Sequence, residues 1–139
     1  MPRVRAGKGT GLADRPPMPQ ATVTPVNHRT PDTSPESIAR EVDYAMQVAR
    51  GYVGWIAGGL ARTPGLGVVR GLDILELGPG PSLAPAVLLA CGGAKVTVSD
   101  RFATRWHAPY HRAVFEALLP RVEEWLPGAS APILELLVA

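Results

Sequence analysis

The segment at residues 71–102, GLDILELGPGPSLAPAVLLACGGAKVTVSDRF, restricts the possible fold more than any other part of the chain. Residues 72–77 form a short apolar run typical of a buried strand, and residues 81–90 have helical character that ends at Gly92-Gly93. Residues 95–99 alternate in the manner of a second, β-branched strand. Strand, helix and strand in this order predict a right-handed crossover between parallel strands, whose carboxyl ends face a ligand crevice.

Helical patterns precede and follow this unit, so we predict an α/β fold with an N-terminal helix and C-terminal helices. Ser34 or Thr33 can cap the first helix, which should end at Gly58-Gly59, before the connection TPGLG. The last third reads as helices, with Pro120 either kinking one helix or starting another. Ser130 can cap a final helix, for which a strand is the alternative. The apolar stripe of the first helix comprises Ile38, Val42, Ala45, Met46, Ala49, Tyr52, Val53 and Ile56.

Residues 1–33 are predicted to be a disordered, basic, proline-rich leader, and residues 34–139 a single domain. Residues 1–30 hold five basic side chains against one acidic side chain, and seven of the 15 prolines fall within the first 35 residues. No aromatic residues interleave with these basic residues, so the pattern argues against nucleic-acid binding. A solvated tail is the favoured interpretation.

No signal peptide follows the basic start, and no apolar run has the length that a bilayer requires. We therefore expect a cytoplasmic protein without membrane contact. The single cysteine, Cys91, lies in the apolar run VLLACGG and is expected to fill the core.

The turn after the first predicted strand has the composition of a ligand site. Gly78 and Gly80 remove side chains where the strand leads into the helix, which lets the backbone approach a bound molecule. Glu76 needs a cationic or hydrogen-bonding partner at the end of a buried strand. Asp100 ends the next strand, where an acid usually accepts a pair of ribose hydroxyls. These residues predict a nucleoside-type ligand, with a tight connection that binds nothing as the alternative.

Nicotinamide and flavin dinucleotides are alternative ligands for this turn. Their fingerprint requires glycine or alanine at the third marked position, where this chain has Leu83, and the carboxylate of Glu76 would repel a pyrophosphate. A P-loop is disfavoured because no Lys-Ser or Lys-Thr pair follows the glycines.

At these residues the sequence resembles the class I S-adenosylmethionine-dependent methyltransferases. The family's first motif, an acid followed by alternating glycines, is matched by Glu76, Leu77, Gly78, Pro79, Gly80, Pro81 and Ser82, with serine in place of the last glycine. The family's ribose-binding acid is matched by Asp100, and the resemblance covers roughly residues 40–119. It implies a Rossmann-like parallel sheet, incomplete in this chain.

The resemblance implies S-adenosyl-L-methionine as cofactor and methyl transfer to an unidentified, small-molecule acceptor. Glu76 would face the methionine portion and Asp100 the ribose, while Arg101 and Phe102 would flank the adenine. For Phe102 a core role is the alternative. Tyr52 or Trp55 would cover the cofactor, although core packing is the favoured role for both. No catalytic residue is assigned.

The family's further strands, which carry acceptor-facing residues, are not found in the sequence. The chain is therefore expected to be an N-terminal portion of such an enzyme, or a relic without activity of its own. Two functional alternatives stay open: a fragment of an NAD(P)-dependent oxidoreductase and a non-catalytic interaction module on the same scaffold.

His107 and His111 lie four residues apart, but Pro109 separates them and no acid or cysteine completes a ligand set nearby, so no metal site is predicted. Either histidine has an intrinsic pKa suited to a catalytic base. Only geometry can assign that role.

Overall fold

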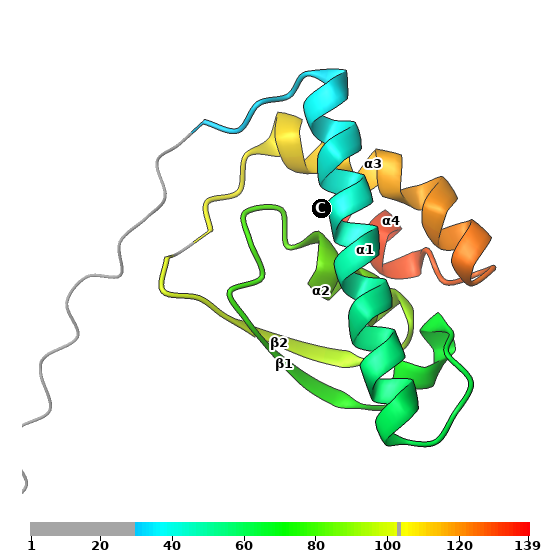
Figure 1. Cartoon of the computed structure of the whole chain (residues 1–139). Helices are drawn as coiled ribbons and strands as arrows, with labels where there is room; N and C mark the ends of the chain where they lie inside the picture. Colours follow the sequence, from blue (N-terminus) through cyan, green and yellow to red (C-terminus); the bar gives the residue numbers. More distant parts are fainter. Residues whose placement is uncertain (1–29, 103) are drawn as a thin grey trace, which may run out of the picture.

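The computed structural model describes residues 30–102 and 104–139 and has a mixed α/β architecture (Figure 1). The predicted leader falls almost entirely on residues 1–29, outside the described residues. In chain order the elements are α1 (Pro35–Gly59), the 3₁₀ helix η2 (Leu66–Val69), β1 (Asp73–Leu77), α2 (Ala84–Cys91), β2 (Lys95–Ser99), α3 (Ala108–Trp125) and α4 (Ala131–Val138).

Helix α1 begins and ends where the sequence predicts. The Ser34 hydroxyl accepts a hydrogen bond from the Ser37 amide at 3.3 Å, and Pro35 occupies the first turn, where its missing N–H costs nothing. The predicted stripe forms the helix's buried face, which packs against α2 and α3. Its fully buried members are Ile38, Val42, Ala45, Met46, Ala49 and Val53, joined by Ala57.

Strands β1 and β2 pair in parallel, as predicted, with a register from Asp73 opposite Lys95 to Leu77 opposite Ser99. The Gly78 amide extends the pairing by donating to the Ser99 carbonyl at 2.8 Å. Helix α2 connects the strands, but it begins at Ala84 rather than at residue 81. The preceding Leu83 adopts a left-handed conformation with φ 58°, which interrupts the helical geometry there.

The helices gather on one side of the two strands (Figure 1). Ile74 and Glu76 of β1 are partly or fully buried on that side, whereas Leu75 and Leu77 point the other way and are exposed. Within the described residues the sheet has two parallel strands, and helices cover one of its faces. The fold is therefore mixed α/β with a parallel strand pair.

The C-terminal third is helical. Pro120 lies inside α3, so of the two alternatives for this proline a single helix is the correct one, and α4 is a helix rather than a strand. Ser130 is the N-cap residue of α4, as predicted, but its side chain makes no capping hydrogen bond. Cys91 is buried in the core as expected, and burial raises the pKa of its thiol to about 11. No helix within the described ranges is both long and apolar enough to span a membrane.

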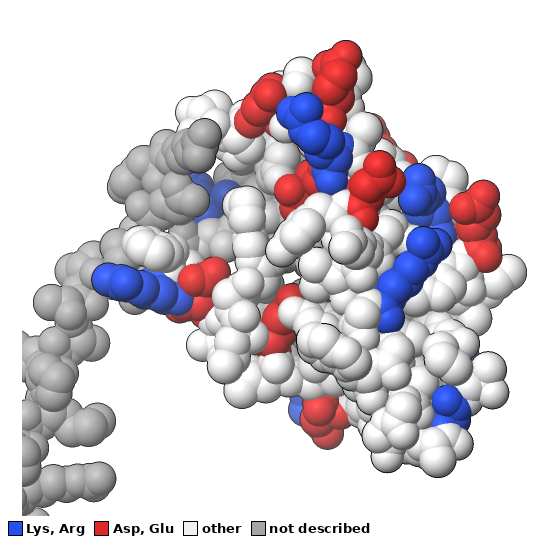
Figure 2. Space-filling view, viewed as in Figure 1, with Lys and Arg blue, Asp and Glu red and all other residues white. Residues whose placement is uncertain are grey.

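Charged side chains on the α1 face of the molecule are mixed in sign (Figure 2). Arg121 of α3 lies 3.3 Å from Asp43 of α1, and Arg112 lies 3.8 Å from Glu116 within α3. Basic and acidic side chains are interspersed on this face, which shows no large positive patch.

Gly92, the residue after α2, packs tightly against η2. A β-carbon at this position would lie 2.5 Å from the Leu66 carbonyl oxygen and 2.5 Å from Cγ2 of Val69. We predict that Gly92→Ala lowers the free energy of unfolding by about 1–3 kcal/mol, because backbone on one side cannot yield to the added methyl.

Gly51, on the exposed side of α1, is the matched control: a β-carbon there meets no atom within 4 Å. Gly51→Ala should raise stability by about 0.5–1 kcal/mol through helix propensity. Urea denaturation of both variants measures the two effects, and a Gly92→Ala protein as stable as wild type would contradict the packing described.

Candidate functional site

The turn that follows β1 is open on its outer side. Gly78 and Gly80 have φ angles of 70° and 78°, in the left-handed region that side chains disfavour, and a β-carbon on either would meet nothing within 4 Å. Both glycines are therefore required by the backbone, and the space in front of them is available to a bound molecule.

Asp100 lies next to this turn. It follows β2 directly, and the bond between the Gly78 amide and the Ser99 carbonyl brings the ends of the two strands together. Asp100 is exposed, and its Oδ1 accepts a hydrogen bond from the Phe102 amide at 3.1 Å. The structure thus brings Gly78, Gly80 and Asp100 to one edge of the sheet, as the sequence predicts.

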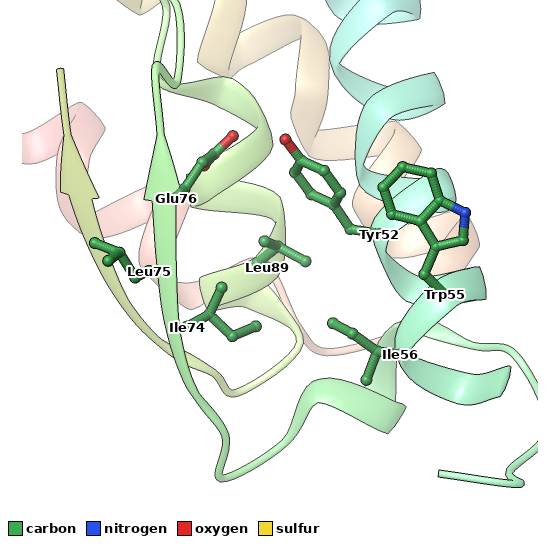
Figure 3. A pocket seen from close by; sticks show the side chains of 7 residues that line it. All are labelled: Tyr52, Trp55, Ile56, Ile74, Leu75, Glu76 and Leu89. Carbon is green, nitrogen blue, oxygen red and sulfur yellow. The ribbon is translucent and has the colours of Figure 1, made fainter. Parts of the chain in front are cut away.

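Glu76 is buried on the covered side of β1, only 5% exposed. Its Oε2 has no hydrogen-bond partner among the described residues. The Tyr52 hydroxyl of α1 and the Glu76 carboxylate point toward one another (Figure 3). Burial raises the pKa of Glu76 above its ordinary value of 4.5, and hydrogen bonding with Tyr52 acts in the opposite direction. Burial and the nearby Glu76 charge in turn raise the pKa of Tyr52.

A cavity of about 210 Å³ lies between α1 and β1 at this carboxylate (Figure 3). Trp55, which was expected to pack in the core, is 77% exposed at this cavity, so that expectation is wrong. Trp55 and Tyr52 are near neighbours, with ring centroids 6.2 Å apart. The lining consists of Tyr52, Trp55, Ile56, Ile74, Leu75, Glu76 and Leu89. It includes Glu76 but neither the two glycines nor Asp100.

Hydrogen bonds fasten the turn to two helices. The buried Ser82 hydroxyl donates to Glu41 of α1 at 2.5 Å and accepts from the Ala84 amide at the start of α2 at 3.2 Å. Nε2 of His111, on α3, lies 3.0 Å from the Pro81 carbonyl oxygen. Because a carbonyl only accepts, Nε2 carries the proton and donates.

His111 is held from other directions as well. Its Nδ1 lies 3.0 Å from both the amide and the carbonyl of His107, and the Trp106 ring stacks on it at 4.3 Å. Burial and the Glu41 charge raise the pKa of neighbouring Tyr110 to about 12. The sequence shows the pair of histidines, but the contact from His111 to Pro81, 30 residues earlier, leaves no periodic signal.

Other residues predicted for the site are arranged differently. Leu77 points to the exposed face of the sheet, and Pro79 is buried in the turn. The Arg101 guanidinium lies over the Phe102 ring at 5.5 Å, and Phe102 is exposed rather than in the core. No cluster of three potential metal ligands occurs within residues 30–102 and 104–139.

Comparison of the chain with protein-family models, with curated proteins and with solved structures finds no match. Interpretation of the site therefore depends on its own geometry and on the motif that the sequence carries.

The buried Glu76 carboxylate predicts a pH-dependent stability cost. Its raised pKa means that the folded state keeps this proton to higher pH than the unfolded state does. Its contribution to the free energy of unfolding therefore falls as pH rises from 4.5 through the raised pKa. Glu76→Gln removes this titration, so the variant should gain about 1 kcal/mol on wild type at about pH 8 but little at about pH 4. Urea denaturation of both proteins at the two pH values measures the difference, and an equal difference at both would contradict it.

The bond from His111 predicts a role in holding the turn. His111→Ala should lower stability by about 1–3 kcal/mol, because the Pro81 carbonyl loses its donor and the ring leaves a void. Amide hydrogen exchange should accelerate at Gly80 and Ser82. His111→Gln, whose amide nitrogen can reach a similar position, should restore part of the protection, and equal exchange in wild type and His111→Ala would count against this role.

Proposed function

We propose that this chain binds S-adenosyl-L-methionine at the carboxyl ends of β1 and β2, as the cofactor-binding part of a class I methyltransferase with a Rossmann-like sheet. The observation that carries the proposal is the buried Glu76 carboxylate with an unpartnered oxygen, two residues before an open glycine turn. A buried, unpaired carboxylate is costly, and a cationic group on a ligand would compensate that cost.

The groups at this edge of the sheet suit an adenosyl amino acid. The bare backbone of Gly78 and Gly80 permits close approach, and the exposed Asp100 carboxylate can accept hydrogen bonds from two ribose hydroxyls. Glu76 would receive the amino end of the ligand, and the paired Arg101 and Phe102 side chains would border the adenine. Net negative charge from the two acids favours a positively charged ligand over a pyrophosphate.

The proposed cofactor supplies an activated methyl group on a sulfonium. The chain's own residues then bind and orient it, which is the main demand that such a reaction makes on a protein. We propose a small-molecule acceptor and assign no catalytic base.

Calorimetric titration of the full chain with S-adenosylhomocysteine, repeated with NAD, tests the proposal. Asp100→Ala should weaken binding of the nucleoside ligand by about 1–3 kcal/mol, since the ribose hydroxyls lose their acceptor. Asp73→Asn is the matched control. It changes an acid at the opposite end of β1, whose exposed pair with Lys95 at 3.6 Å contributes little.

Three results would overturn the proposal: no binding of S-adenosylhomocysteine, tighter binding of NAD, or equal affinity in the Asp100→Ala and Asp73→Asn proteins. Tighter NAD binding would favour the oxidoreductase alternative, and binding of neither would favour an interaction module.

A further inference from the structure

The cavity between α1 and β1 combines three features that recognise one kind of ligand. It holds a buried carboxylate oxygen without a partner, two aromatic rings, and aliphatic side chains that line the rest of its wall. The polar atoms of the lining side chains belong to Glu76, Tyr52 and Trp55 alone. Figure 3 shows the Glu76 carboxylate on the β1 side of the cavity and the two aromatic residues on the α1 side.

The electrostatics of this lining favour a cation. Oε2 of Glu76 offers an acceptor that no described residue uses, and the faces of aromatic rings attract positive charge. Lys and Arg are absent from the lining, so no side chain there would favour an anion. A metal ion is disfavoured because Glu76 is the lining's one carboxylate and the walls are otherwise apolar.

The size and wall of the cavity favour an organic cation with an apolar body. The cavity has a volume of about 210 Å³. That space accommodates a ring or short chain with an amino group. Ile56, Ile74 and Leu89 would contact the apolar part.

We propose that this cavity binds a small organic ammonium ion, with the charged nitrogen on Oε2 of Glu76 and the apolar body between Trp55 and the aliphatic wall. The proposal shares Glu76 with the proposed cofactor site, but it uses neither the glycine turn nor Asp100. Glu76 is the one residue that both proposals use, and in both its carboxylate receives a positively charged nitrogen.

Calorimetry of the full chain with 2-phenylethylammonium at about pH 8 tests the inference. The pKa of Glu76 is raised, so a pH well above 4.5 favours its charged form. The probes for comparison are 2-phenylethanol, of similar shape without charge, and 3-phenylpropanoate, of opposite charge. We expect saturable binding of the ammonium ion, at least tenfold tighter than the alcohol, and no binding of the carboxylate.

Variants locate the site. Glu76→Gln should abolish the preference for the ammonium ion over the alcohol, whereas Glu124→Gln, a change of an exposed acid on α3, should leave it unchanged. Trp55→Ala should weaken ammonium binding by about two- to fivefold, the range for an aromatic ring at an exposed site. Because Trp55 is exposed, we expect Trp55→Ala to keep the fold, so it tests the site even if Glu76→Gln does not fold.

Equal affinity for the alcohol and the ammonium ion, absence of saturation, or an ammonium affinity unaffected by both Glu76→Gln and Trp55→Ala would overturn the inference. Asp100→Ala separates the two proposals: it should weaken S-adenosylhomocysteine and leave 2-phenylethylammonium unaffected. Failure of one ligand to bind therefore leaves the result for the other intact.

Discussion

The packing of α1 against α2 and α3 is the constraint on which the remaining structure depends. Its stripe of apolar side chains, from Ile38 to Ala57, forms much of the buried core. The flanks of the same helix reach the site at two places. Glu41 bonds Ser82 of the turn, and Tyr52, about 16 Å further along the helix axis, faces Glu76. Docking of one helix thus positions both the glycine turn and the carboxylate.

The site combines an open edge with a buried charge. The turn leaves room in front of Gly78 and Gly80. Glu76, the residue before Leu77, lies on the opposite face of β1 and is buried under the helices. Side chains of β1 alternate between the two faces, so neighbouring residues of one short strand meet opposite environments. The cofactor proposal and the cation proposal both derive from this arrangement. Both use the Glu76 carboxylate, which the first combines with the glycine turn and Asp100 and the second with Tyr52 and Trp55.

Local patterns in the sequence predicted the elements well. The Ser34 cap, the stripe of α1, the parallel pair and the position of the glycine turn all follow from periodicity and turn chemistry. The start of α2 was missed because Leu83 adopts a left-handed conformation that no residue preference indicates. The exposure of Trp55 and the bond from His111 to Pro81 depend on how distant elements pack, and a single sequence does not encode such contacts in any local pattern.

The bond from α3 to the turn has a further property. His111 donates through Nε2 to the Pro81 carbonyl, 30 residues earlier in the chain, which leaves its Nδ1 to accept from the His107 amide at 3.0 Å. The Trp106 ring stacks on the same imidazole, so the ring is held at both nitrogens and on one face. A side chain of α3 thereby ties the loop before α2 to the C-terminal third of the chain, and a displacement of α3 would carry this loop with it.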